Sequence, residues 1–369
     1  MSLLFVSTLL AAETPQQQVA APERKVISQA ATVEVVFVID TTGSMSGLIQ
    51  GAKDTIWTVV NDFAMQEPQP EIRVGLVAYR DRGDEYITRS LPLTGDLDHV
   101  YGWLYDLNAD GGGDTPESVG RALYSAVNDM SWTGKGQGPV YRSVFVVGDA
   151  PNKAYADELS PRKIVGLARD RGIYVNAIQC GNAGATTTEF AAIASLGSGA
   201  FQQVAQSGGV ATLVSPMDDE LARLERELAS TVVAYGGEAD EVVEKLEKSA
   251  SSSASVKAAR LSTLSKLGGV AVTGDGDLVT DWKEGKIDLE DEEAMPEELA
   301  SLSVAERKRT LEKNAEDRGE LQAQIDELVA ARDAWVEEQR EAAPSAAPSY
   351  DREVVDSSIE ALRSLGYVY

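Results

Sequence analysis

Three oxygen-bearing side chains, Asp40, Thr42 and Ser44, follow an apolar run rich in β-branched residues at 33–39. This run is too short for a globular helix and is typical of a strand buried on both faces of a sheet. Because the three side chains alternate along the chain, we expect them to point into one loop above the end of that strand. Oxygen donors without sulfur or imidazole favour Mg²⁺, Ca²⁺ or Mn²⁺ over Zn²⁺ or Cu²⁺. The sequence therefore predicts a site for a hard divalent cation.

Strand and helix patterns alternate along residues 31–212. The predicted strands are 33–39, 72–79, 86–92, 142–148, 173–179 and 200–203. The predicted helices lie near 46–65, 97–107, 117–130, 161–171 and 187–196. This alternation predicts an α/β fold with a doubly wound, mostly parallel six-stranded sheet that binds ligands at the carboxyl edge of its strands. The strand at 86–92 follows its neighbour after a short turn, so we expect it to be an antiparallel edge strand.

Other loops should reach the same edge of the sheet. A Gly-rich loop at 111–117 precedes a helix, and its last residue, Glu117, would complement the dipole of the first helical turn. Asp149 directly follows the buried strand at 142–148. The loop at 79–84 contains Arg82-Gly83-Asp84, a tripeptide that some integrins bind, and we interpret this occurrence as chance. The predicted cation site therefore draws on several separate parts of the chain.

The segment Asp40-Thr41-Thr42-Gly43-Ser44 resembles the D-x-S-x-S or D-x-T-x-S loop of von Willebrand factor A domains. In that family the loop opens a metal-ion-dependent adhesion site. The resemblance implies a second ligand in the Gly-rich loop and an aspartate after the fourth strand, which Asp149 matches. For the second ligand, Glu117, Thr115 and Asp114 all remain candidates, and Glu117 looks like the D-x-P-E version of the integrin β-type domain.

The resemblance also implies how such a site works. Thr42 and Ser44 would contact the ion directly, while Asp40 and Asp149 would hold its waters and orient the hydroxyls. An ion with few direct carboxylates stays electron-poor and attracts a carboxylate from a partner protein. We therefore expect a non-enzymatic, divalent-cation-dependent protein-binding module with no catalytic residues. The alternative is an accessory subunit of an AAA-type ATPase or chelatase, whose motor would be a separate protein because this chain has no Walker motif.

The composition narrows the classes of partner and chemistry. The 369 residues include 33 basic and 59 acidic side chains, for a net charge of −26. Such a surface repels phosphate backbones, so we expect no nucleic-acid partner. The single cysteine, Cys180, excludes an intramolecular disulfide and a cysteine-ligated zinc site. The single histidine, His99, leaves little provision for imidazole catalysis.

The two ends of the chain differ from this central domain. We interpret residues 1–12 as a secretory signal peptide and residues 13–30 as a linker. The protein would then be exported to the periplasm or outside the cell, and otherwise would be cytoplasmic. The apolar stretch at 1–12 is shorter than the ~20 residues that span a bilayer. We expect no integral membrane segment.

Residues 213–369 carry helical patterns joined by turns and predict an all-α C-terminal region. Its longest helix is expected at 303–341, and a final helix near 354–365. Leu321, Ile325, Leu328 and Trp335 recur at near-heptad spacing along the longest helix. This pattern fits either a helical hairpin that folds back on the chain or a short coiled coil with a partner.

Overall fold

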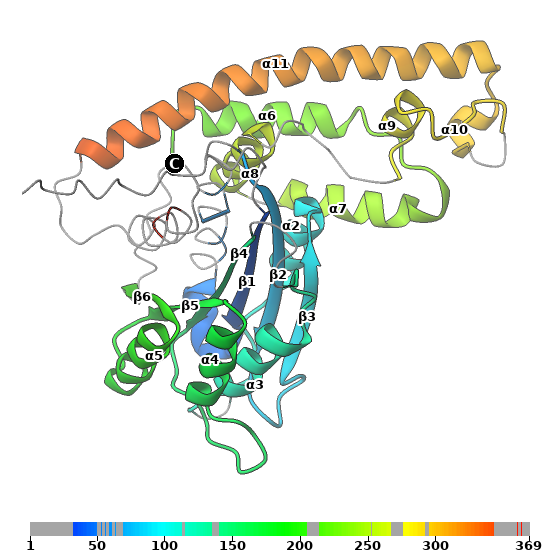
Figure 1. The fold of residues 1–369 in the computed structure, drawn as a ribbon. Coiled ribbons are helices and arrows are strands. Elements are labelled where there is room, and N and C mark those ends of the chain that lie inside the picture. Colours follow the sequence, from blue (N-terminus) through cyan, green and yellow to red (C-terminus); the bar gives the residue numbers. More distant parts are fainter. Residues whose placement is uncertain are drawn as a thin grey trace, which may run out of the picture.

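The computed structural model describes residues 32–342 except 50–52, 54–55, 57–58, 61–62, 64–68, 113–114, 135–139, 205–213, 252, 267–275 and 292–294, and also residues 360 and 363. Within these residues six strands form one sheet in the order β3-β2-β1-β4-β5-β6 (Figure 1). The strands are β1 (Thr32–Asp40), β2 (Glu71–Tyr79), β3 (Thr88–Thr94), β4 (Val140–Gly148), β5 (Tyr174–Cys180) and β6 (Ser198–Val204). Only the β2–β3 pair is antiparallel. The predicted mostly parallel sheet with an antiparallel edge strand is confirmed.

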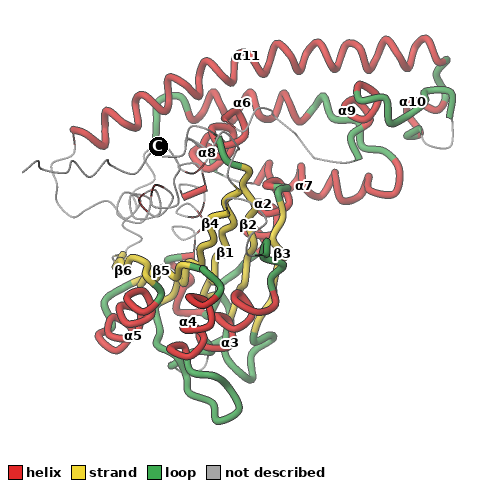
Figure 2. The backbone as a smooth tube through the Cα atoms, viewed as in Figure 1, coloured by secondary structure: helices red, strands yellow, loops and turns green. Residues whose placement is uncertain are grey.

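The side chains of β1 alternate between two apolar cores, one on each face of the sheet. Phe37 and Ile39 belong to the core that also holds Leu104, from helix α2. Val36 and Val38 belong to the other core, which holds side chains of helices α3, α4 and α5. These helices are α2 (Leu97–Asp106), α3 (Val119–Tyr124), α4 (Pro161–Asp170) and α5 (Gly184–Leu196). Figure 2 shows α3, α4 and α5 together on one side of the sheet. The sheet is therefore buried on both faces, as its continuous apolar strands predict.

Two predicted helices differ in detail from the structure. The helix expected near 46–65 begins as a 3-10 turn, η1 (Gly43–Gly47), and its described residues from 49 to 63 are helical. The helix expected near 117–130 starts at Val119 and ends in a π-helical turn, η2 (Ser125–Asp129). Its start moves because Glu117 forms a parallel bridge with Asn152 instead of entering the helix.

The described part of the C-terminal region is helical, as expected. Its elements are α6 (Asp218–Ala229), η3 (Gly236–Glu238), α7 (Ala239–Ser251), α8 (Ala254–Lys266), α9 (Leu278–Lys283), α10 (Glu297–Ala300) and α11 (Val304–Ala342). The segments 1–12 and 13–30 lie outside the described residues, as does the helix expected near 354–365 except for residues 360 and 363. Among the described helices, none combines the length and the apolar composition needed to cross a bilayer.

The long helix α11 folds back on its own chain. Leu321 and Ile325 pack into one apolar cluster with Leu224 of α6 and Leu261 of α8. Nearer its start, Leu311 packs into a second cluster with residues of α9 and α10. Figure 1 shows α11 running beside α6. Leu321, Ile325 and Leu328 are thus covered by contacts within the chain, which is the folding-back arrangement of the two that the sequence allowed, whereas Trp335 is half-buried and belongs to neither cluster.

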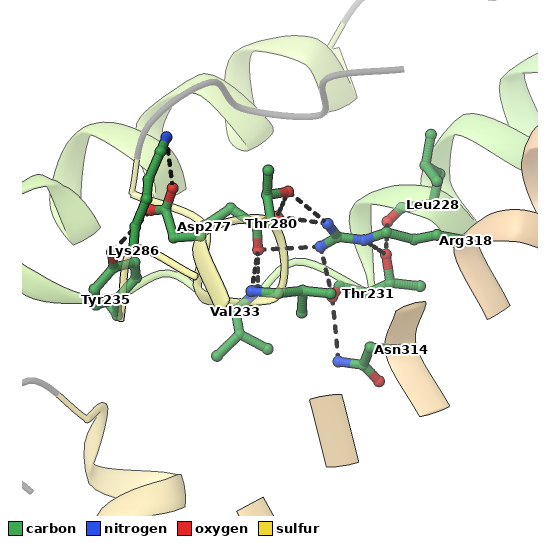
Figure 3. A network of polar contacts seen from close by, with 11 residues as sticks. Leu228, Thr231, Val233, Tyr235, Asp277, Thr280, Lys286, Asn314 and Arg318 are labelled. Carbon is green, nitrogen blue, oxygen red and sulfur yellow. Dashed lines mark hydrogen bonds and ion pairs between the residues drawn. The ribbon is translucent and has the colours of Figure 1, made fainter. Parts of the chain in front are cut away.

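A layer of polar contacts around Arg318 (Figure 3) lies along α11 between Leu311 of one cluster and Leu321 of the other. Arg318 of α11 donates to both carboxylate oxygens of Asp277, at 2.5 and 3.0 Å, and to the Thr231 hydroxyl at 2.7 Å. Burial raises the pKa of Asp277, but hydrogen bonds and charge from Arg318 outweigh it and lower the pKa below the ordinary value. Because a shifted helix would leave both charges buried and unpaired, this layer fixes the register of α11.

The helical region packs against the end of the sheet at which the parallel strands begin (Figure 1). Gln69, just before β2, donates to the carbonyl oxygen of Lys266 in α8. The Arg260 guanidinium of α8 lies 5.2 Å from the ring centroid of Tyr101 in α2, within cation–π range. Val256 of α8 joins the core on the α2 face of the sheet. The opposite end, where the parallel strands finish, carries the predicted cation loops.

Candidate metal centre

A continuous chain of close polar contacts links the predicted ligands at the carboxyl ends of β1 and β4. The Thr42 hydroxyl donates to Asp40 Oδ1 at 2.6 Å, and the Thr42 amide donates to the same oxygen at 2.9 Å. The Ser44 hydroxyl donates to Asp149 Oδ1 at 3.0 Å. Asp40 and Thr42 are buried, Asp149 is half-buried and Ser44 is exposed. The chain therefore leads from the interior to the surface and joins four of the predicted site residues.

The two hydroxyl oxygens approach each other without a proton to share. Thr42 Oγ1 and Ser44 Oγ lie 3.1 Å apart. Each hydroxyl has one proton, and both protons already point to carboxylates, at Asp40 and Asp149. The lone pairs of both oxygens are therefore available to one bound cation. Neighbouring ligands of an octahedral Mg²⁺, each ~2.1 Å from the ion, are separated by about 3.0 Å. The hydroxyl pair thus fits adjacent positions around a small divalent cation.

In the metal-free protein the ionised forms of the Asp40 and Asp149 carboxylates are unfavourable. Burial raises the pKa of Asp40 to about 7, and the charge of Asp149 adds to the rise against the hydrogen bonds from Thr42. Burial also raises the pKa of Asp149, although the Ser44 hydroxyl opposes it. Asp40 Oδ2 is buried and has no hydrogen-bond partner within the described part of the chain. A bound cation would supply the charge compensation that these two groups lack.

The Gly-rich loop brings one of its three candidate ligands to the site. Glu117 is 2% exposed, and a Cβ added at Gly112 would lie between it and Thr42, 3.5 Å from Glu117 Oε1 and 3.1 Å from Thr42 Cβ. Thr115 is exposed to solvent. Asp114 lies outside the described residues. Of the two candidates that the structure describes, Glu117 is therefore the one whose carboxylate lies near Thr42.

Close approach of two loops requires glycine at two positions. Gly111 and Gly112 have φ values of +73° and +75°, which side chains other than glycine rarely adopt. The carbonyl of Gly111 accepts a hydrogen bond from the Gly43 amide at 3.0 Å. Asp84 holds the same loop, because its Oδ1 accepts from the Gly112 amide and its Oδ2 from the Asp81 amide, each at 3.0 Å. Both oxygens of the Asp84 carboxylate are therefore engaged inside the protein, which agrees with the chance interpretation of the Arg82-Gly83-Asp84 tripeptide.

Asp81 joins three loops beneath the site. Its carboxylate accepts from the Ser118 hydroxyl at 2.7 Å, from the Lys153 ammonium at 2.7 Å and from the Tyr155 hydroxyl at 2.8 Å. Burial raises its pKa, but the hydrogen bonds, that from Lys153 foremost, bring the net pKa below the ordinary value. The Lys153 amide also donates to the Glu117 carbonyl at 2.7 Å. This cluster holds the backbone of Glu117 in place, and the sequence analysis did not assign it a role.

Tyr79 is the other residue that the sequence analysis missed. It ends β2 directly opposite Asp40, its backbone carbonyl accepts from the Thr41 amide and hydroxyl, and its side chain is fully buried. Burial raises its pKa well above the ordinary value, and the charges of Asp40, Asp149 and Glu117 raise it further. Its place as the last residue of an apolar strand at the carboxyl edge was the available sequence signal.

The donor set excludes some metal chemistry. Within the described residues, no group of three or more His, Cys, Asp and Glu side chains is arranged to hold a metal ion by itself. A cation held here would therefore also need neutral oxygen donors, and the Thr42 and Ser44 hydroxyls offer two. Burial raises the pKa of Cys180, close by at the end of β5, to about 12, so its thiol stays protonated and is a poor ligand.

The sequence of this chain is similar to a known domain family and to a protein of known sequence. Residues 34–215 match the profile of the von Willebrand factor A domain. A protein of Acanthamoeba polyphaga mimivirus described as an ariadne-like RING finger protein is 31% identical over 88 residues, which span 24% of this chain and 9% of that protein.

Solved structures show similar folds at low identity. Proximal thread matrix protein 1 from the mussel byssus is 18% identical with a TM-score of 0.37, and the match covers 48% of this chain and 42% of that one. A form of the same protein with a zinc-occupied MIDAS motif is 15% identical with a TM-score of 0.38, covering 56% and 61%. The SpRpn10 VWA domain is 17% identical with a TM-score of 0.36, covering 47% and 88%.

Proposed function

Since this chain belongs to the von Willebrand factor A domain family, whose members are generally metal-dependent protein-interaction modules, we propose that it binds a protein partner through a divalent cation held at the carboxyl edge of the sheet. The cation is Mg²⁺, Ca²⁺ or Mn²⁺, and the partner supplies a carboxylate to its open position. The module performs no reaction of its own. The alternative role, as an accessory subunit of an ATPase or chelatase, would use the same site.

One observation carries this proposal. Thr42 Oγ1 and Ser44 Oγ lie 3.1 Å apart while both of their protons are donated to carboxylates. The pair fits adjacent positions around an octahedral Mg²⁺ and also around a seven-coordinate Ca²⁺, whose equatorial ligands lie about 2.8–3 Å apart. The absence of imidazole and thiolate donors at the hydroxyl pair supports these hard cations over Zn²⁺.

The arrangement also supports a role in binding. Ser44 is exposed and Asp149 is half-buried, so a partner can approach the cation from solvent. Ligation by neutral hydroxyls leaves most of the cation's charge uncompensated, and a carboxylate from a partner would compensate it. A direct bond from the Glu117 carboxylate would reduce that attraction.

Calorimetric titration of Mg²⁺ tests the cation site. The wild type should bind Mg²⁺, and Asp149→Ala should lose most of the affinity. Asp219→Ala is the matched control, because it removes an exposed carboxylate from α6 and changes the net charge equally. Wild-type protein that binds no Mg²⁺, or equal affinity in wild type and Asp149→Ala, would refute the site.

Affinity capture tests the partner. Immobilised wild type and Asp149→Ala are exposed to extract from the source cells, with Mg²⁺ and with chelator. A partner should be retained only by the wild type and only with Mg²⁺. Retention that survives both the chelator and the substitution would refute a cation-dependent interface. A captured partner that hydrolyses ATP would favour the accessory-subunit role.

A further inference from the structure

The Tyr79 hydroxyl oxygen and Asp40 Oδ2 are two buried polar atoms that both lie next to Gly148. A Cβ added at Gly148 would overlap the Tyr79 hydroxyl oxygen and lie 3.1 Å from Asp40 Oδ2. Both oxygens are shielded from solvent, and neither has a hydrogen-bond partner of ordinary geometry in the described part of the chain. Tyr79 and Asp40 are also paired in register across β2 and β1. The backbone therefore fixes the phenol and the carboxylate as neighbours.

A hydrogen bond between these two groups can have only one direction, from the phenol to the carboxylate. The Asp40 carboxylate uses Oδ1 to accept from Thr42 and leaves Oδ2 as an acceptor. The Tyr79 phenol carries its proton at neutral pH, as an ordinary phenol does. The phenol can therefore donate to Asp40.

We propose that Tyr79 is a positioning residue of the cation site, whose hydroxyl donates to Asp40 Oδ2 when a cation is bound. This inference rests on the proposed cation binding at Thr42 and Ser44. The bond would hold the carboxylate so that Oδ1 keeps accepting the Thr42 proton and leaves the lone pairs of that hydroxyl to the cation. Gly148 is the required partner in this arrangement, because any side chain there would occupy the place of the phenol oxygen.

A purely structural role for Tyr79 predicts a different outcome. Its ring packs in an apolar core with Val38 and Val146, and Tyr79→Phe preserves those contacts while removing one oxygen atom. In the metal-free protein that oxygen meets the Asp40 carboxylate without ordinary hydrogen-bond geometry, so its removal should leave the unfolding temperature unchanged or raise it. In the Mg²⁺-bound protein the bond to Asp40 would be lost.

The test is the Mg²⁺ affinity of Tyr79→Phe by calorimetric titration, with the unfolding temperature measured in chelator. The dissociation constant should rise about tenfold, as expected for one hydrogen bond to a charged group. Tyr174→Phe is the matched control, since it removes the same atom at the start of β5, and it should leave the affinity unchanged. An affinity of Tyr79→Phe within twofold of the wild type would overturn the proposal. A large fall in the metal-free unfolding temperature would also overturn it.

A second pair of variants tests the geometry independently. Gly148→Ala should weaken Mg²⁺ binding, because the new methyl group displaces the phenol oxygen and crowds Asp40. Tyr79→Phe in that background should restore part of the affinity by vacating the space. No rescue would contradict the proposed arrangement. Failure of the wild type itself to bind Mg²⁺ would instead refute the proposed function.

Discussion

The substitution Asp40→Asn should stabilise the metal-free protein above neutral pH. Burial raises the Asp40 pKa from 3.8 to about 7, so the folded protein holds this proton more tightly than the unfolded chain does. The free energy of unfolding therefore falls as the pH rises from about 4 to about 7, by about 4 kcal/mol in full. Asparagine has nearly the same shape, keeps an oxygen acceptor for Thr42 and does not titrate.

Urea unfolding in the presence of chelator measures this effect. The sequence pI of about 4.4 makes low pH unsuitable, so the range from about pH 5.5 to 8.5 is used. Across this pH range the free energy of unfolding of the wild type should fall by about 2 kcal/mol, and that of Asp40→Asn should not show this fall. Titrating groups that do not interact with Asp40 contribute equally to both proteins and cancel in the difference. Parallel pH profiles would refute the reasoning, because they would mean that Asp40 is not a buried, uncompensated acid.

Excess Mg²⁺ should reverse the order of stability. A ligand that binds only the folded state stabilises it in proportion to the logarithm of its concentration. The wild type should gain this stabilisation and Asp40→Asn should not, so the variant changes from the more stable to the less stable protein at pH 8. If Mg²⁺ stabilises both proteins equally, Asp40 does not belong to the cation site.

Three further substitutions test the Gly-rich loop and the helical region. Glu117→Gln should lower the affinity for Mg²⁺ in calorimetric titration, whereas Thr115→Ala should leave it unchanged; the opposite order would assign the ligand to the exposed residue. Arg318→Ala should destabilise the protein by roughly 3–5 kcal/mol in urea unfolding, because it leaves the buried Asp277 carboxylate unpaired, and should not change Mg²⁺ affinity. A loss below about 1 kcal/mol would mean that water replaces the guanidinium.

The sheet could be predicted because its signals are local. A run of β-branched residues such as 33–39, followed at once by polar residues, indicates both a buried strand and the edge at which it ends. The short connection before 86–92 likewise indicates an antiparallel neighbour. The placement of Asp40 and Asp149 at one edge follows from these patterns and from parallel pairing.

The rest of the site depends on contacts between distant residues. The sequence left Glu117, Thr115 and Asp114 as candidates, with Glu117 favoured by its spacing to the next helix, because spacing alone does not show which side chain is buried. Tyr79 reaches Asp40 only because β1 lies between β2 and β4, an order that local patterns do not fix. The apolar spacing of α11 likewise does not distinguish a partner helix from α6 and α8 of the same chain.

The position of the helical region bears on how the site can be used. α8 contacts α2 and the segment before β2, at the end where the parallel strands begin, whereas the cation loops follow the ends of β1 and β4. The described helices therefore leave the carboxyl edge open to a partner (Figure 1). α2 contacts α8 through Tyr101 and leads directly into the Gly-rich loop, so it is the element through which the helical region could influence the site. Any such influence requires differential contacts in the cation-bound and cation-free states.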